Sequence, residues 1–207
     1  MDIKDVVYSR NVVEFVTVAK EFCAFLEGCE KHTARSFVGA CNKVLPLLYY
    51  KATLLPETEP VYDETNEQFV TESDYSTIEN KVEYLLGQHN QYVEVNDPRV
   101  DELTGLYTAS IAEYLADIYQ DLKNFVLRYQ VGNTYVMNDA LWECINNFKD
   151  FWGIRLANLI RAFHILAHQN IDLDNIKHPD KSEGAERNTS DWFVTRRQQD
   201  MDHNELM

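Results

Sequence analysis

Apolar residues recur every three or four positions over five stretches of the chain, which is the spacing of one buried face of an α-helix. The first stretch begins at the capping residue Asn11 and ends at Gly28, and the second begins near Thr33 and ends at Pro56. The second stretch also contains Pro46. Because proline lacks an amide hydrogen and crowds the preceding turn, we expect a kink or a break there.

The other three stretches follow residue 72. The third is capped by Ser73 or Asp74 and stops at Gly87. The fourth has the most regular pattern and covers about 105–129, while the fifth covers about 138–170, with its first residue, an asparagine, as the cap. The fifth stretch is apolar on several faces, which predicts a helix that other helices surround or that lies at a subunit contact.

Three segments lack this spacing. Residues 56–74 contain two prolines and many acids, which predicts an exposed loop. Residues 92–95 alternate briefly between polar and apolar, but one short strand does not make a sheet. Beyond residue 178 the chain is polar and aperiodic. The pattern therefore predicts an all-α fold: a single helical bundle of about five helices over 1–178, with an acidic loop, followed by a polar, flexible tail over 179–207.

The negative charge of the chain is concentrated in its middle third. The 207 residues include 34 acidic and 19 basic residues, for a net charge of −15. Residues 52–121 hold 16 acidic residues and only 2 basic ones, Lys81 and Arg99. Such a surface repels phosphate backbones and anionic lipid headgroups, so we expect no direct nucleic-acid or membrane binding. It favours a basic protein partner instead.

The cysteines and the apolar runs indicate the cellular compartment of the protein. No apolar run approaches the roughly 20 residues that a membrane span requires, and the first residues do not resemble a secretion signal. The four cysteines form no CxxC pair, which favours buried free thiols over a disulfide framework. We therefore expect a cytoplasmic protein.

Acidic residues on two predicted helices form a candidate metal site. Glu113, Asp117 and Asp121 are spaced by four, so they lie along one side of the fourth helix. Glu79 and Glu83 of the third helix are available as partners. Carboxylate oxygens are the ligands that Mg²⁺ and Mn²⁺ prefer. The alternative, which the sequence favours, is a solvated flank with a salt bridge to Asp117 or Asp121.

Arg155 is the unusual residue of the fifth helix, because its angular position falls inside the apolar stripe. A charge in that position requires a partner. We expect a structural ion pair between Arg155 and Asp117 or Asp121 across the helix interface. On the same helix, His164 and His168 are spaced like metal ligands, but a solvated or interface pair is the better interpretation, and their role stays open.

Four segments resemble a family of bacterial proteins that is known only as a domain of unknown function. They are VEFVTVAKEFCAFLE, LPLLY, EYLADIYQDL and WGIRLANLIRAFH, and with the linking pieces they cover about residues 11–168. The resemblance implies a small cytoplasmic helical protein with no assigned activity. It therefore transfers no catalytic residue to this chain.

Two functions are compatible with these features. The first is a non-enzymatic binding or regulatory module that holds no cofactor and offers the acidic region 52–121 to a basic partner. The second is a metal-dependent hydrolase that uses Mg²⁺ or Mn²⁺ on a nucleotide or phosphoester, similar to the all-helical nucleotide pyrophosphohydrolases. Those enzymes use ExxE and ExxD pairs, whereas ENKVE and EYLAD are each one residue wider. The sequence favours the first function, and it leaves the oligomeric state open.

Overall fold

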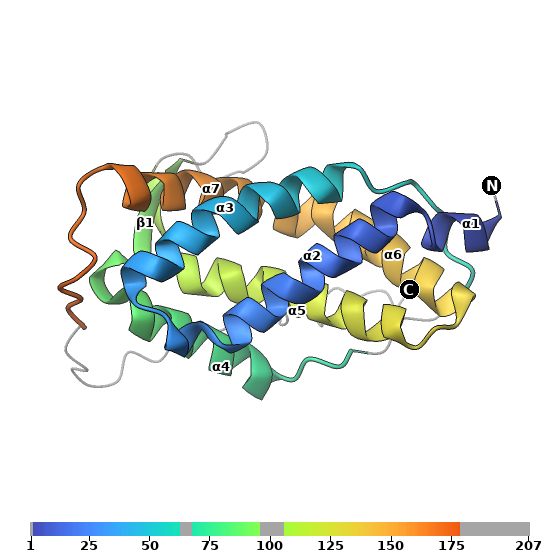
Figure 1. The fold of residues 1–207 in the computed structure, drawn as a ribbon, viewed down its shortest axis with the longest axis horizontal. Coiled ribbons are helices and arrows are strands. Elements are labelled where there is room, and N and C mark those ends of the chain that lie inside the picture. The colour runs from blue at the N-terminus through green and yellow to red at the C-terminus, as the bar shows by residue number, and fades with distance from the viewer. Residues whose placement is uncertain (1, 63–67, 96–105, 179–207) are drawn as a thin grey trace, which may run out of the picture.

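The computed structural model describes residues 2–62, 68–95 and 106–178. In these ranges the chain forms seven α-helices and one pair of antiparallel strands (Figure 1). The helices are α1 (Ile3–Val7), α2 (Arg10–Glu27), α3 (Ala34–Thr53), α4 (Glu72–Leu86), α5 (Ile111–Gln130), α6 (Thr134–Asn147) and α7 (Gly153–His168). The strands are β1 (Gln91–Val95) and β2 (Leu106–Ser110), and the predicted all-α class is confirmed.

Helix α5 is the centre of the bundle. It packs against α2, α4, α6 and α7, and 14 of its 20 residues are buried, so neighbouring helices cover it on most sides (Figure 1). Phe125 of α5 contacts Phe15 of α2 with ring centroids 5.5 Å apart. The amphipathic spacing that predicted these helices thus buries one continuous core, because each apolar stripe faces α5 or a helix beside it.

Several predicted helix ends are confirmed and others are wrong. The Thr33 hydroxyl caps α3 by accepting a hydrogen bond from the Ser36 amide, and α3 continues through Pro46 without a break. The cap of α4 is Thr71, in a capping box with Asp74, rather than Ser73 or Asp74 itself. Asn11 does not cap α2, because the helix already starts at Arg10. The side-chain amide of Asn11 instead donates to the carbonyl of Leu54.

The predicted start of the fourth helix is wrong because its first residues form a strand. β1 pairs with β2 in antiparallel register, with Gln91 opposite Ser110 and Val95 opposite Leu106. The chain enters α5 directly from β2, and the Ser110 hydroxyl caps the helix by accepting from the Glu113 amide. The alternation over 92–95 was therefore one half of a strand pair.

The predicted last helix is divided in two. Asn133 caps α6, three residues after α5 ends, so Asn138 is a buried helical residue rather than the cap. A single π-helical turn (Phe148–Trp152), which we call the π-turn, separates α6 from α7. At its end the Gly153 amide donates to the Phe148 carbonyl, and a side chain on Gly153 would collide with that carbonyl. Glycine thus permits the close approach of the backbone.

The predicted tail over 179–207 lies outside the described residues, so the domain boundary at 178 stays a prediction. After α7 the chain continues as an irregular segment over 171–178, which we call the strap. The strap returns past the first turn of α3 and the last turn of α4 (Figure 1). It therefore closes one end of the bundle.

Candidate functional site

Arg155 of α7 forms an ion pair with Asp117 of α5. Its Nη1 atom lies 2.8 Å from Asp117 Oδ2, and the Asp117 side chain is only 4% exposed. Tyr75 of α4 donates its hydroxyl hydrogen to Asp117 Oδ1 at 3.0 Å. The guanidinium of Arg155 also stacks over the Tyr114 ring, 5.3 Å from its centroid. Of the two carboxylates that the sequence offered to Arg155, the structure selects Asp117.

Burial dominates the electrostatics of this cluster. Burial raises the pKa of Asp117, while the charge of Arg155 and the hydroxyl of Tyr75 oppose that rise. The pKa of the Tyr75 phenol is raised far above its usual value by burial and by Asp117, with smaller contributions from Glu113 and Glu79. The cluster therefore joins three helices through one buried carboxylate, which is a structural arrangement.

The five carboxylates predicted as metal ligands do not supply a group of three that could hold an ion, although Glu79 and Glu113 lie near enough to Tyr75 to affect its pKa. Asp121 accepts a hydrogen bond from Asn147 of α6 at 2.8 Å, on the side of α5 that faces α6. Among the residues that the structure describes, no three His, Cys, Asp or Glu side chains gather closely enough to hold a metal ion. Asp117 is held by Arg155 and Tyr75. Glu79, Glu83 and Glu113 form no metal-binding group of three with Asp117 or with Asp121.

His164 and His168 lie side by side on an exposed face of α7. Their ring centroids are 4.7 Å apart, and Nε2 of His168 lies 3.2 Å from the amide nitrogen of Asn42 on α3. All four cysteines are free and buried, and burial raises the pKa of each thiol, to about 12 for Cys23. Thiols with raised pKa values are poor nucleophiles, so they fill the core.

Sequence reasoning missed a set of buried polar residues that hold the acidic loop. The Asp139 carboxylate accepts hydrogen bonds from the amides of Val61 and Tyr62, at 2.8 and 3.0 Å. The Asn124 carbonyl oxygen does the same for Phe69 and Val70, also at 2.8 and 3.0 Å. The available signal was the polar character of these two residues inside apolar stripes. The loop residues that the structure describes, 56–62 and 68–71, are mostly exposed, as predicted, but the backbone amides at 61–62 and at 69–70 are anchored to the core helices.

A cavity lies between the strap, the first turn of α3 and the last turns of α4. We call this cavity, of about 630 Å³, the strap groove. Its apolar lining comes from Ala34, Tyr84, Leu85, Leu173 and Ile176. Polar residues form the remaining lining: Glu30, His32, Thr33, Asn80, Lys81, Asp174 and His178.

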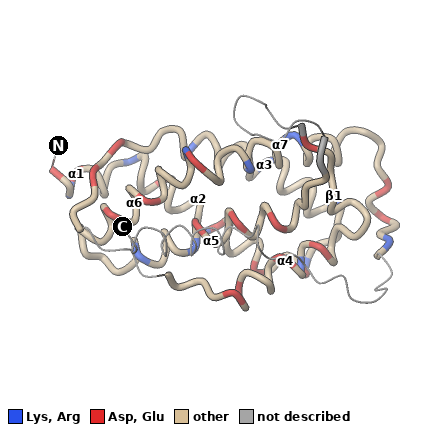
Figure 2. The backbone as a smooth tube through the Cα atoms, turned by 180° about the vertical axis from the view of Figure 1, so that it is seen from behind, with Lys and Arg blue, Asp and Glu red and all other residues tan. Residues whose placement is uncertain are grey.

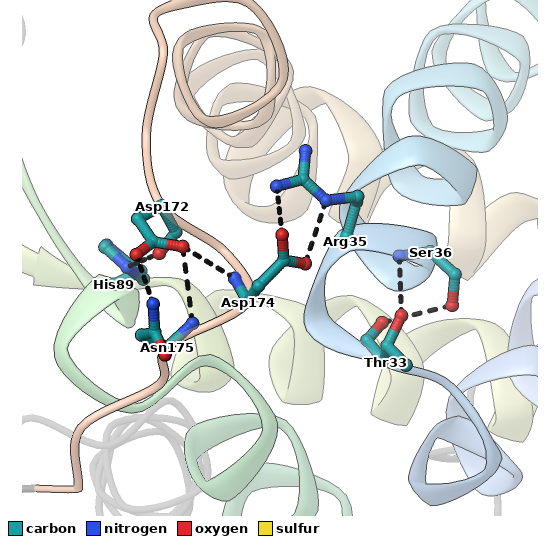
Figure 3. Close-up of polar contacts among 7 residues, drawn as sticks. All are labelled: Thr33, Arg35, Ser36, His89, Asp172, Asp174 and Asn175. Carbon is teal, nitrogen blue, oxygen red and sulfur yellow. Dashed lines mark hydrogen bonds and ion pairs between the residues drawn. The ribbon is translucent and has the colours of Figure 1, made fainter.

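Paired polar contacts fix the strap against the bundle (Figure 3). Asp174 accepts two hydrogen bonds from the Arg35 guanidinium, at 3.0 and 2.7 Å. Asp172 accepts from the amides of Asp174 and Asn175, and its own carbonyl lies 3.1 Å from Nε2 of His89 (Figure 3). These contacts hold the wall of the strap groove in one position.

Gly87 is the second anchor of the strap. Its φ of +50° is a conformation that side chains disfavour. A Cβ atom there would also lie 2.5 Å from Ile176 Cγ2 and 2.5 Å from the Lys177 carbonyl oxygen. The neighbouring Gln88 amide donates to that carbonyl at 2.9 Å. Gly87 thus ends α4, as predicted, and also lets the strap approach the backbone.

A smaller cavity, of about 390 Å³, lies between α2, α4, α5 and the end of the acidic loop, and Lys81 lines both cavities. Lys81 Nζ lies 3.1 Å from Glu30 and donates to the Glu27 carbonyl at 2.8 Å. Lys123 pairs with the Glu27 carboxylate at 2.6 Å, and the Tyr119 hydroxyl donates to the same oxygen at 2.9 Å. These cations are therefore balanced by Glu27 and Glu30.

Comparisons with known proteins agree with this architecture. The chain is similar to protein BF1032 from Bacteroides fragilis, whose crystal structure has 40% sequence identity and a TM-score of 0.71. That similarity covers 81% of this chain and 98% of the other. None of the curated proteins matches the chain. Within the described ranges, no helix combines the length and the hydropathy that crossing a membrane requires.

The same comparisons identify a family. A family model described as Domain of unknown function (DUF5063) matches residues 6–169, from the end of α1 through α7. The match includes the core helices and ends before the strap. By its sequence and by its fold, this chain is a member of the family of bacterial helical proteins described as DUF5063.

Proposed function

We propose that the protein is a non-enzymatic binding or regulatory module whose acidic region docks a basic protein partner. The observation that carries the proposal is the exposure of acidic residues along the acidic loop and at the start of α4. Glu57, Glu59, Glu72 and Asp74 are exposed on the acidic loop and on the first turn of α4. We call these four residues the acidic surface, and Figure 2 shows acidic positions on α4.

The basic residues near this surface are largely engaged. Lys81 is the one basic residue of 52–121 within the described part, and it pairs with Glu30 and the carbonyl of Glu27. Lys149 pairs with Glu57 at 3.2 Å, but both side chains are mostly exposed, so this pair is weak. The exposed carboxylates thus create a negative potential that attracts basic surfaces and speeds association.

The buried carboxylates support a binding module over a metal-dependent hydrolase. A hydrolase of that kind needs carboxylates from two helices around one cation. Here Asp117 is committed to Arg155 and Tyr75, and Asp121 to Asn147. We therefore propose no resident metal. Calorimetric titration with Mg²⁺ or Mn²⁺ that detects binding, lost in Asp117→Asn, would reverse the choice between the two functions.

We also propose that the protein acts in the cytoplasm. Four free, buried thiols support this location, because a reducing compartment keeps cysteines unpaired. A fluorescent fusion followed by cell fractionation tests it.

The docking proposal is tested by affinity capture from lysate at low and at high salt. The test variant is Glu57→Gln, Glu59→Gln and Glu72→Gln, which leaves Asp74 to cap α4. The matched control removes three exposed acids elsewhere: Asp5→Asn, Glu21→Gln and Asp150→Asn. We expect a basic partner that high salt releases and that only the test variant loses. Equal losses in both variants, or no salt-sensitive partner, would contradict the proposal.

A further inference from the structure

The strap groove has an open apolar side. Tyr84 is 71% exposed, which is the largest exposed fraction among the large hydrophobic residues of the described ranges. Its ring stacks on His178, with centroids 4.3 Å apart and an interplanar angle of 10°. Leu85, Leu173 and Ile176 continue the apolar lining behind this pair. The groove thus offers a flat aromatic platform beside an aliphatic floor, which suits a large apolar side chain.

The chain itself leads directly from this groove into its C-terminal segment. His178 lines the groove, and 29 residues follow it in the sequence. Among these, Trp192-Phe193-Val194 is the longest run of adjacent apolar residues. The strap and everything after it also lie outside the family match, which ends at residue 169. The strap wall of the groove and this run therefore both lie in the C-terminal part of the chain that the family match leaves out.

We propose that the strap groove binds the Trp192–Val194 segment of the same chain, with the indole of Trp192 against Tyr84. The inference goes beyond the acidic surface, because it concerns a different face and an intramolecular ligand. Thirteen residues separate Trp192 from His178. A random coil of that length has an end-to-end distance of about 20 Å, so the segment reaches the groove at an effective concentration in the millimolar range.

Charge supports the same occupant. Arg196 and Arg197 follow the apolar run by two residues. On the groove, the carboxylates of Glu30 and Asp174 are 53% and 67% exposed, although each already has a basic partner. Exposed carboxylates of this kind accept a second guanidinium at the rim while the apolar residues occupy the floor. The segment thus matches the groove in both its apolar and its charged parts.

The test uses the full chain labelled with 5-fluorotryptophan and read by ¹⁹F NMR. The three tryptophans give three signals, and Trp192→Phe assigns the one of interest. The difference in chemical shift between H₂O and D₂O reports the exposure of each indole, with the urea-unfolded chain as reference. Trp152 is completely buried, so its signal also shows that the fold is intact.

We expect the Trp192 signal to be shielded from solvent in the parent chain and to reach the unfolded value in Tyr84→Ala. The matched control is Tyr50→Ala, which removes a tyrosine that is 57% exposed on α3 and should leave the signal unchanged. A Trp192 signal that is fully exposed in the parent overturns the proposal. A shielded signal that Tyr84→Ala does not change, or that depends on protein concentration, also overturns it, because the segment then binds elsewhere or in a second copy.

Discussion

The carboxylate of Asp117 accepts from two sides at once: from Arg155 Nη1 at 2.8 Å and from the Tyr75 hydroxyl at 3.0 Å. The Arg155 contact links α5 to α7, and the Tyr75 contact links α5 to α4. Because the carboxylate is almost completely buried, its charged form depends on both partners for stabilisation.

Removing one member of the Arg155–Asp117 ion pair should lower the free energy of unfolding more than removing both. We expect Arg155→Met to lower the free energy of unfolding by about 3–5 kcal/mol, because it leaves a buried carboxylate without its cation. The double variant Arg155→Met, Asp117→Leu should recover part of that loss. Urea unfolding measures both values. Arg161→Met, which removes an exposed arginine of the same helix, is the control. Unchanged or increased stability in Arg155→Met would show that the pair has no structural role.

Gly87 should tolerate a side chain less well than Gly132. Both have positive φ, +50° and +77°, so alanine strains the backbone at either position, by about 1–3 kcal/mol. At Gly87 the new Cβ also meets Ile176 and the Lys177 carbonyl at 2.5 Å, whereas nothing lies within 4 Å of it at Gly132. Thermal unfolding should therefore show a larger decrease in Tm for Gly87→Ala. Equal decreases would mean that the strap does not contact Gly87 in solution.

The acidic loop should be released by changes in the core helices. In Asp139→Ala the amides of Val61 and Tyr62 lose their acceptor, so we expect their hydrogen exchange to become faster. In Asn124→Ala the same should hold for Phe69 and Val70. Each variant serves as the control for the other, because the two sets of amides have different acceptors. Faster exchange at all four amides in either variant would indicate general destabilisation instead.

Glu14 should make the stability of the fold depend on pH in the acidic range. Hydrogen bonds from Lys51 and Arg10 lower the pKa of Glu14 to about 2, below the value of about 4.3 in an unfolded chain. A depressed pKa stabilises the fold above about pH 4.3, and this contribution is lost as the pH falls towards 2. The decrease in Tm caused by Glu14→Gln should therefore be present at pH 6 and disappear near pH 2. Glu21→Gln, an exposed acid on the same helix, controls for the change in net charge; a pH-independent difference for Glu14→Gln would contradict the ion pairs.

Helical periodicity was sufficient to predict the bundle and the need of Arg155 for a partner, because both follow from the angular position of residues on one helix. The strand pair was missed because the pairing of Gln91 with Ser110 depends on two segments that no local pattern connects. The anchoring of the loop was missed for a similar reason. Asp139 binds backbone amides, and any residues at 61 and 62 other than proline provide those amides.

The candidate site was harder to predict than the fold. The spacing of Glu113, Asp117 and Asp121 correctly places them on one side of α5, but it contains no information on which neighbouring helix each one faces. The strap groove depends on residues as distant as Ala34, Tyr84 and Leu173, which only the tertiary structure brings together. Gly87 was predicted as a helix stop, and its contact with the strap could not be seen in the sequence.

The π-turn affects how the sequences of related proteins must be aligned with this chain. It inserts one residue into what would otherwise be a continuous helix, and one residue corresponds to a rotation of about 100°. A homologue that lacks this insertion must either shift its apolar pattern by one position after the deletion or expose the equivalents of Leu156 and Phe163. Alignments that treat a gap at 148–152 as neutral will therefore assign the wrong residues to the core of α7.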